Sequence, residues 1–94
     1  MVLRFRDKRT RTFAMGGFVR EFEAFKNQAA KRLAILEAAT RLDDLRGLPS
    51  NHLEALRGDW MGQWSIRINR QWRICFEWSA DSVGPAGVEI MDYH

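Results

Sequence analysis

The stretch QWSIRINRQWRICFEW, residues 63–78, decides the fold of this 94-residue chain. Apolar and polar side chains alternate along it, a pattern typical of strands that bury one face. A turn around Asn69-Arg70 divides the stretch into two halves and predicts an antiparallel hairpin. One face of this hairpin would present the side chains of Trp64, Ile66, Ile68, Trp72, Ile74, Phe76 and Trp78.

The register of the hairpin follows from which residues must share a face. Residues directly opposite each other on paired strands point to the same side of a sheet. A three-residue loop over 69–71 sets apolar residues opposite each other, as in Ile66 opposite Ile74, whereas a two-residue loop would mix apolar with polar residues. The same register sets Arg67 opposite Arg73. Either an anion then lies between the two guanidinium groups, or both extend into water.

The residues on either side of the hairpin complete the predicted fold. From Phe18 onward, apolar residues recur at spacings of three and four, which is the period of a helix. Asp7 is placed to cap an earlier helix, which Gly16-Gly17 ends. The elements that we expect are an edge strand over 2–5, helices over 8–15 and 18–41, a helical turn over 43–46 and a last strand over 88–91.

This order of elements indicates the α+β class, with N-terminal helices packed on a small, mainly antiparallel sheet. A length of 94 residues fits a single domain over 1–94. Trp64, Trp72 and Trp78 fall on the apolar strand face, so we expect them in the core. Trp60 falls in an expected loop, where it could stack on a base or pack partly against the protein.

Several chemistries are excluded by what the sequence lacks. Cys75 is the single cysteine, so no intramolecular disulfide is expected, and two histidines beside it do not make a structural zinc site. The sequence has no glycine-rich phosphate loop, His-Glu-x-x-His motif or serine elbow, so we expect no metal and no cofactor. No apolar run reaches the roughly 18 residues of a membrane span, and none follows the basic N-terminus as in a secretory signal. We therefore expect a cytoplasmic protein that does not contact a membrane.

The net charge of +3 is distributed unevenly. Residues 1–20 have a net charge of +5 and residues 57–73 one of +3, whereas residues 74–94 have one of −4. Arginine makes up 12 of the 15 basic residues, and its planar guanidinium suits phosphate groups and base stacking. This pattern is consistent with binding of nucleic acid, and the alternative interpretation is an ordinary solvated surface.

A small set of side chains could perform chemistry without a metal. Cleavage of RNA by its own 2′-hydroxyl needs a base for that hydroxyl, cations for the charge on the phosphate and an acid for the leaving 5′-oxygen. Asp92, Tyr93 and His94 can transfer protons, unless these last residues form an inert surface tail. The arginines that could stabilise the charge are Arg57, Arg67 and Arg73.

Four segments of the sequence resemble HigB toxins of the RelE/ParE superfamily. They are LEALRGD (53–59), GQWSIRIN (62–69), QWRICF (71–76) and VEIMDYH (88–94), and residues 1–50 fit more loosely. The resemblance implies a RelE-like fold and a bacterial toxin that cleaves messenger RNA in the A site of the 70S ribosome, without a metal. It also implies a HigA-like helix-turn-helix antitoxin as partner, with operator DNA bound only through the toxin–antitoxin complex.

The resemblance further implies roles for individual residues. Asp92, Tyr93 and His94 match functional residues of the family, and Arg73 matches an arginine that we assign to the scissile phosphate. Arg57 stands where the family has a functional lysine. We expect catalytic roles for these five residues. We expect RNA contacts from Arg67, Arg70, Trp60 and Glu54.

The sequence departs from the family pattern at Glu54, where some members have a histidine. Glu54 could accept a proton, although a carboxylate facing a phosphate backbone is electrostatically unfavourable. His52 would share a face with Glu54, at a displacement of roughly 6.6 Å, if the strand extended that far. We interpret His52 as a solvated bystander at the edge of a loop.

Two other functions stay open. ParE-type relatives on the same fold inhibit DNA gyrase, and a noncatalytic RNA-binding module is also compatible with the sequence. The Asp92-Tyr93-His94 sequence and the basic strand face favour RNA cleavage, because a gyrase inhibitor needs neither.

Overall fold

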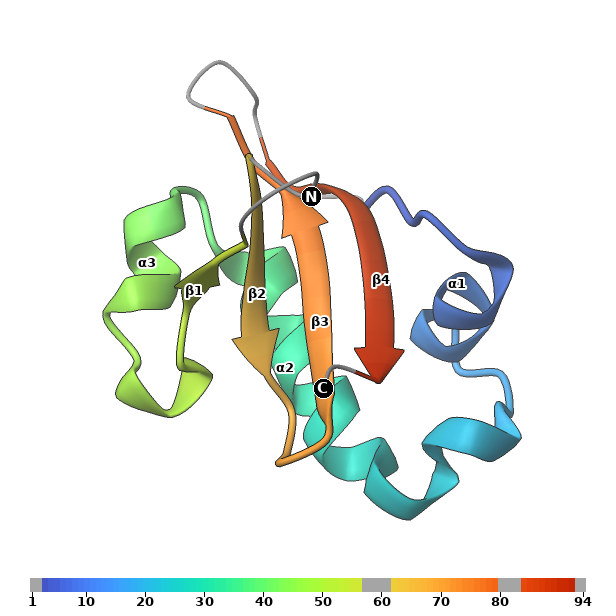
Figure 1. Ribbon diagram of the computed structural model, residues 1–94. Coiled ribbons are helices and arrows are strands. Elements are labelled where there is room, and N and C mark those ends of the chain that lie inside the picture. The colour runs from blue at the N-terminus through green and yellow to red at the C-terminus, as the bar shows by residue number, and fades with distance from the viewer. Residues whose placement is uncertain (1–2, 57–61, 80–83, 93–94) are drawn as a thin grey trace.

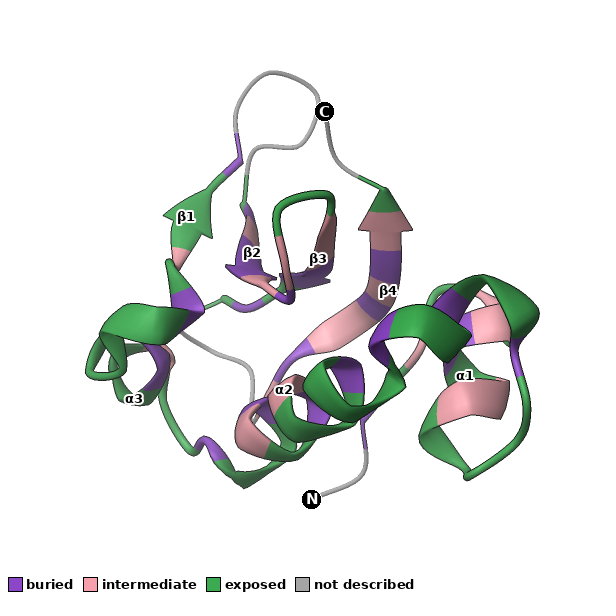
Figure 2. Ribbon diagram, turned by 90° about the horizontal axis from the view of Figure 1, so that it is seen from below, coloured by how far each residue is buried: buried purple, intermediate pink, exposed green. Residues whose placement is uncertain are grey.

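The computed structural model describes residues 3–56, 62–79 and 84–92, and shows an α+β fold of one sheet and one layer of helices (Figure 1). The sheet is antiparallel, with the strand order β1-β2-β3-β4. The helices lie together on one side of the sheet (Figure 2). The helical elements are α1 (Lys8–Ala14), η1 (Arg20–Phe25), α2 (Lys26–Ala38), α3 (Leu42–Arg46) and η2 (Pro49–Asn51), where η marks a 3₁₀ helix. The strands are β1 (Glu54–Ala55), β2 (Gln63–Arg67), β3 (Trp72–Glu77) and β4 (Ala86–Asp92).

The predicted hairpin register is confirmed. Ile66 pairs with Ile74 and Arg67 pairs with Arg73 across β2 and β3. The Ile68 N–H then donates to the Trp72 carbonyl at 3.0 Å, which leaves residues 69–71 as the predicted three-residue loop. Asn69 stabilises this loop, because its side-chain oxygen accepts hydrogen bonds at 2.8 Å from the backbone N–H groups of both Gln71 and Trp72. An asparagine in this role is a known source of turn stability. The sequence thus fixes both the pairing and the turn.

The two short helices are also confirmed. Asp7 caps α1, where its side chain accepts a hydrogen bond from the Thr10 N–H at 3.3 Å. After α1, Gly16 adopts a φ of +90°, which a residue with a side chain rarely adopts. The predicted turn over 43–46 is α3, which ends at Gly47.

The helix predicted over 18–41 is wrong in its extent. Its first part is the 3₁₀ helix η1, and the backbone departs from helical geometry at Phe25, where φ is −129° and ψ is 26°, before α2 begins. Three residues per turn place Phe22 and Phe25 on one side. Both rings contact Trp72, with centroid separations of 5.6 and 5.1 Å. Packing against the sheet therefore outweighs the continuity of a single α-helix.

The edge strand predicted over 2–5 is reduced to one isolated parallel bridge, between Phe5 and Val88. The Val88 N–H donates to the Arg4 carbonyl at 2.9 Å, and the Arg6 N–H donates to the Val88 carbonyl at 3.0 Å. The pairing stops there because Asp7 turns the chain into α1 as its N-cap. Residue 2 lies outside the described residues.

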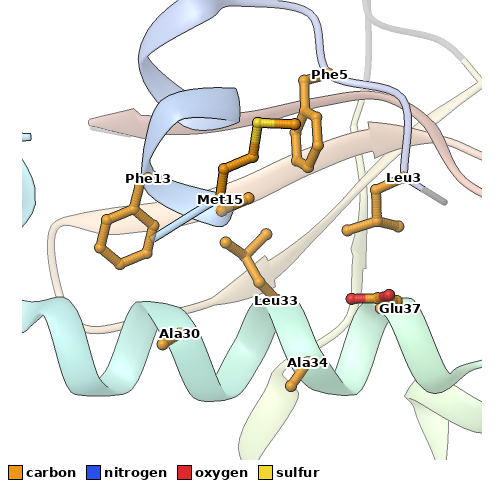
Figure 3. A pocket seen from close by; sticks show the side chains of 9 residues that line it. Leu3, Phe5, Phe13, Met15, Ala30, Leu33, Ala34 and Glu37 are labelled. Atoms are coloured by element: carbon orange, nitrogen blue, oxygen red, sulfur yellow. The ribbon is translucent and has the colours of Figure 1, made fainter. Parts of the chain in front are cut away.

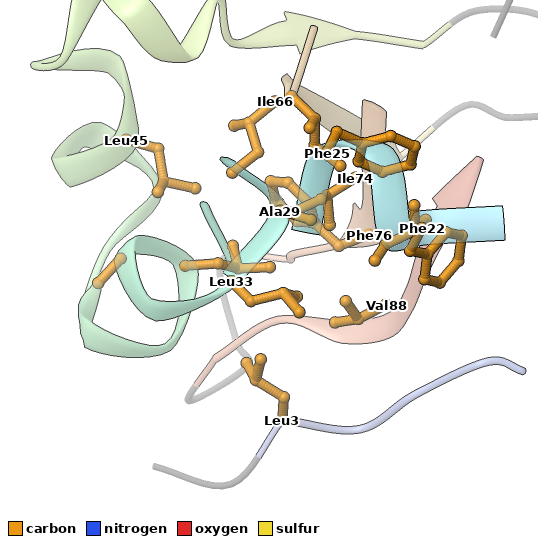
Figure 4. Packing of buried hydrophobic residues seen from close by; sticks show 14 of the residues in the cluster. Leu3, Phe22, Phe25, Ala29, Leu33, Leu45, Ile66, Ile74, Phe76 and Val88 are labelled. Carbon is orange, nitrogen blue, oxygen red and sulfur yellow. The ribbon is translucent and has the colours of Figure 1, made fainter. Parts of the chain in front are cut away.

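The core fills the space between the sheet and the helices (Figure 4). Ile66, Ile74 and Phe76 of the sheet face Phe22 and Phe25, and all five are at most 5% exposed. The core prediction for the tryptophans is confirmed, because Trp78 is buried and Trp64 and Trp72 pack against the cluster. None of the helices in the described part of the chain is long and apolar enough to span a bilayer.

Candidate functional site

The face of the sheet that points away from the helices is the candidate site, and we call it the open face. No helix of the described residues covers it (Figures 1 and 2). Because side chains alternate across a strand, the residues opposite the core positions share this face. By register it includes Glu54 of β1, Ser65 and Arg67 of β2, Arg73 and Cys75 of β3, and Glu89 and Met91 of β4.

Arg73 is the most strongly held charged side chain on the open face. Its Nε donates to the Ser65 hydroxyl at 2.8 Å, and its Nη2 donates to the carbonyl of His52 at 2.7 Å. Nη2 also lies 3.5 Å from the Glu54 carboxylate, and only 13% of the Arg73 side chain is exposed. Among the described residues, no acceptor is bonded to Nη1. One edge of the guanidinium is thus fixed by the protein, and the Nη1 side is left to face a ligand.

Arg67 lies directly opposite Arg73 and adds a second positive charge. Its Nε donates to the Asn69 carbonyl at 3.1 Å. The alternative in which both arginines extend into water is wrong for Arg73, whose side chain is mostly buried. The other alternative, an anion between the two groups, stays a prediction. Two like charges held side by side create a site of positive potential.

Glu54 neutralises part of this charge. Its side chain is 57% exposed, and one carboxylate oxygen lies 3.5 Å from Arg73 Nη2. An RNA phosphate that approached Arg73 would meet this carboxylate. The RNA contact of Glu54 stays a prediction, and the structure shows only that its carboxylate lies beside the cation of Arg73.

His52 does not share a strand face with Glu54, because β1 begins at Glu54. His52 caps η2 in the left-handed conformation, with φ 47° and ψ 53°. Its side chain is exposed, which agrees with the bystander interpretation, and the part of His52 that reaches the site is its carbonyl oxygen.

Asp92 ends β4 and is exposed. It pairs with Trp72, whereas Met91 pairs with Arg73, so the Asp92 and Arg73 side chains leave the sheet on opposite faces. The Asp92 carboxylate accepts a hydrogen bond from Gln71 Nε2 at 2.9 Å. The structure therefore does not bring Asp92 onto the open face with the arginines.

The remaining predicted residues are placed only in part. Arg70 is exposed in the loop between β2 and β3, at the end of the hairpin. The predictions for Arg57, Trp60, Tyr93 and His94 concern positions outside the described residues. Their roles stay predictions.

Cys75 lies on the open face but is only 1% exposed. Burial raises the pKa of its thiol to about 11, which keeps it protonated near neutral pH. A protonated, buried thiol is a poor nucleophile. Within residues 3–56, 62–79 and 84–92, no three His, Cys, Asp or Glu side chains lie close enough together to hold a metal ion.

A separate apolar groove lies on the helix side of the molecule (Figure 3). It has a volume of about 350 Å³, and Glu37 is its one ionisable lining residue among those described. Phe13 and Met15 of the α1 region line it together with Leu33 of α2. Beyond Met15, the side chain of Phe18 is 72% exposed, although the periodicity predicts it on a buried face. This groove offers no cation to a phosphate.

The family is decided by a match over almost the whole chain. Residues 3–94 match the family model of RelE-like toxins of the type II toxin–antitoxin system HigB. The chain belongs to this family. The resemblance in the sequence and the α+β fold agree with this membership.

Individual relatives of the HigB family match in part. The chain is 42% identical to "Toxin HigB-1" of Vibrio cholerae serotype O1 over 55 residues, which are 58% of each protein. It is 35% identical to an uncharacterised protein of Haemophilus influenzae over 65 residues, which are 69% of this chain and 64% of that protein. The matched stretches therefore span less than two thirds of these relatives. A solved "YoeB/ParE toxin from Agrobacterium tumefaciens" shares the fold, with a TM-score of 0.50 and 18% identity over 100% of this chain and 99% of that one.

The sequence analysis does not predict the two contacts that hold Arg73, from the Ser65 hydroxyl and from the His52 carbonyl. Ser65 could have been found, because the predicted register already set it on the face of Arg73 and Arg67. The contact of the His52 carbonyl could not have been predicted, because every residue type has a backbone carbonyl and the sequence therefore contains no signal for it.

Proposed function

We propose that this chain is a ribosome-dependent endonuclease that cleaves messenger RNA by attack of the RNA 2′-hydroxyl on the adjacent phosphate. The observation that carries the proposal is the pair of Arg67 and Arg73 on the open face of a HigB-family fold. Arg73 is held by the neutral oxygens of Ser65 and His52, so these contacts do not cancel its charge.

Arg73 would stabilise the charge that develops on the phosphate. The 2′-oxygen bonds to phosphorus while a base takes its proton, and the bond to the 5′-oxygen breaks while an acid protonates that oxygen. The products are a 2′,3′-cyclic phosphate and a 5′-hydroxyl end. The nucleophile belongs to the RNA, so the reaction needs no metal-bound water. Preorganised donors aimed at the phosphate stabilise the transition state more than mobile ones do.

The proton-transfer roles fall to Asp92, Tyr93 and His94 in this proposal, and Arg57 would support the charge on the phosphate. Asp92 would act from the end of β4, on the opposite face from Arg73. A contribution from its carboxylate at the phosphate would thus require RNA to pass around this end of the sheet.

The wider RNA contacts would come from the exposed end of the hairpin. Arg70 is exposed there and could contact ribosomal RNA, and Trp60 could stack on a base. Arginine suits both phosphate and base stacking. We propose that these contacts form in the A site of the 70S ribosome, in the cytoplasm.

The proposed partner of the free toxin is a HigA-like helix-turn-helix antitoxin. The support is the membership in a family of type II toxin–antitoxin toxins. Operator DNA would be bound only through the toxin–antitoxin complex.

The test is cleavage of a defined messenger RNA by the purified protein, with and without programmed ribosomes. Cutting on ribosomes only, with 2′,3′-cyclic phosphate and 5′-hydroxyl ends, is the expected result. A transcript with a single 2′-deoxynucleotide at the cut position is the matched substrate control, and it should stay intact. EDTA in the ribosome-free arm tests for contaminating metal-dependent nucleases.

Intact messenger RNA in both arms would contradict the proposal. A DNA supercoiling assay would then test gyrase inhibition. RNA binding without cleavage would instead identify a noncatalytic RNA-binding module.

A further inference from the structure

We propose that the left-handed backbone of His52, fixed by the buried side chain of Asn51, positions the guanidinium of Arg73. His52 and Asn51 are thus positioning residues that act through Arg73. The expected effect of this positioning on cleavage rests on the proposed function, whereas the orientation of Arg73 itself does not. The geometric part can be measured without any activity.

His52 has an unusual backbone. It is the only non-glycine residue with positive φ among those described, with φ 47° and ψ 53°. Its N–H donates to the Pro49 carbonyl at 3.1 Å and closes the η2 turn. Its own carbonyl then accepts the hydrogen bond from Arg73 Nη2 at 2.7 Å. A change of φ and ψ at His52 would rotate this carbonyl away from Arg73.

Asn51 explains why the turn keeps this shape. Its side chain is fully buried, and both of its ends are bonded. Its Nδ2 donates to the Leu45 carbonyl at 3.0 Å, and its Oδ1 accepts from Arg32 Nη1 at 2.6 Å. These hydrogen bonds connect η2 to α3 and α2 at the residue that immediately precedes the left-handed His52. The helical layer thereby sets the direction of an acceptor on the other side of the sheet.

Arg73 is suited to this arrangement. A guanidinium group has five N–H donors in a fixed plane, so two bonds on one edge set the direction of the rest. Ser65 bonds Nε and the His52 carbonyl bonds Nη2. Both acceptors are neutral, so the bonds that orient Arg73 do not cancel its charge, which is offset only in part by the exposed Glu54 carboxylate 3.5 Å from Nη2.

Two substitutions at one position separate the backbone of His52 from its imidazole. His52→Gly and His52→Val both remove the imidazole ring. Glycine adopts the left-handed conformation without strain, whereas a β-branched valine opposes it. The variants therefore differ in the direction of the carbonyl. Asn51→Ala removes both hydrogen bonds of the Asn51 side chain and, among the described side-chain anchors, leaves the turn only the longer bond from Arg32 Nη1 to the Ser50 hydroxyl, at 3.3 Å. This variant should therefore behave like His52→Val.

The direct readout is the rotation of the Arg73 guanidinium about its Nε–Cζ bond, measured by NMR as exchange between the two Nη resonances. These resonances are assigned to Arg73 because they are absent from the spectrum of the Arg73→Lys variant. We expect rotation about tenfold or more faster in His52→Val and in Asn51→Ala than in His52→Gly, because the Nη2 bond is lost. Equal rotation rates in His52→Gly and His52→Val would overturn the inference.

The second readout is single-turnover cleavage of ribosome-bound messenger RNA. Misplacement of a catalytic group by a fraction of an ångström to 1 Å costs up to about 10²-fold in rate. We therefore expect His52→Val to cleave about tenfold or more slowly than His52→Gly at saturating ribosomes, with KM within about twofold. If His52→Gly is instead the slower of the two variants, the inference is overturned in favour of a role for the imidazole or for local rigidity.

Thr10→Val is the matched control for a general loss of stability. Thr10 is fully buried at the opposite edge of the sheet, and its hydroxyl accepts a hydrogen bond from the Ile90 N–H at 3.0 Å. This variant loses a buried hydrogen bond without touching Arg73, so rotation and cleavage should stay at the wild-type level. If wild-type protein fails to cleave while the rotation rates differ as expected, the proposed function fails and the positioning is supported.

Discussion

The two faces of the sheet are built from the same strands but differ in the polarity of their side chains and in what covers them. The face toward the helices is apolar and is closed by Phe22 and Phe25 (Figure 4). The open face has Arg67 and Arg73 side by side, with Glu54 at its edge. Because the side chains alternate, each substitution on β2 or β3 acts mainly on one face. Stability and function can therefore be perturbed separately in this molecule.

The largest expected effect lies on the helix side. Phe22→Ala should lower the free energy of unfolding by about 3–5 kcal/mol, because a fully buried ring is lost and a cavity is left. Urea unfolding followed by circular dichroism measures this loss. Phe18→Ala, at a 72% exposed position, is the matched control and should change stability by less than about 0.5 kcal/mol. Equal losses for the two variants would contradict the described core.

The next effect lies on the open face. Arg73→Ala should lower the rate of ribosome-dependent cleavage by about 10²–10³-fold, as expected when one donor to the reacting phosphate is removed. The cleavage rate of Arg73→Lys should lie between the rates of wild type and Arg73→Ala, because lysine keeps the charge but lacks the fixed planar donors. Arg20→Ala, an exposed arginine of η1, is the matched control and should cleave like wild type. Cleavage by Arg73→Ala within about twofold of wild type would rule out its role at the phosphate.

A smaller effect concerns pH and the buried part of the open face. Burial raises the pKa of Cys75 from 9.0 to about 11, so between these values the unfolded chain releases a proton that the folded chain keeps. The contribution of this thiol to the free energy of unfolding should therefore be fully present below pH 9. It should decrease as the pH rises toward 11, by at most about 1.4 kcal/mol for each pH unit. Urea unfolding at several pH values measures this slope, and Cys75→Ala should remove the contribution. An identical slope in the variant would show that other groups cause it.

The smallest effect concerns the ion pair at the edge of the open face. Glu54→Gln removes the carboxylate that would compete with a phosphate for Arg73. The Glu54 carboxylate is 57% exposed, so solvent screens this pair and limits it to about 0.2–1 kcal/mol, and RNA affinity should rise by roughly 1.4- to 5-fold at low salt. Binding of a short labelled RNA measures it, with Glu23→Gln of η1 as the matched control. A loss of cleavage at unchanged affinity would instead indicate that Glu54 transfers a proton.

The apolar face could be predicted from the sequence because its pattern is local. Alternation and a three-residue loop were enough to obtain the pairing of Ile66 with Ile74 and of Arg67 with Arg73. The break at Phe25 could not be predicted in this way, because it depends on contacts with Trp72, far along the chain. Long-range packing overrides a periodic pattern that is equally compatible with one continuous helix.

The open face could be predicted only in part. The register already placed the two arginines together, but the contacts that hold Arg73 come from a backbone carbonyl and from a buried turn. The sequence also grouped Asp92 with the arginines, whereas its pairing with Trp72 turns it to the opposite face. The pairing of β4 on β3 shifts register between Cys75 and Glu77, and alternation along the sequence does not show such a shift, so this outcome could not be read from the sequence.

In the proposed function, RNA binds to the open face and not to the helix side. The most direct test is an NMR titration of the protein with a short RNA that carries 2′-deoxynucleotides and cannot be cleaved. We predict that the backbone amide shifts change at Ser65, Arg67 and Arg73, and stay constant at Phe13 and Leu33 in the apolar groove. Shift changes confined to α1 and α2 would show that RNA binds to the helix side instead.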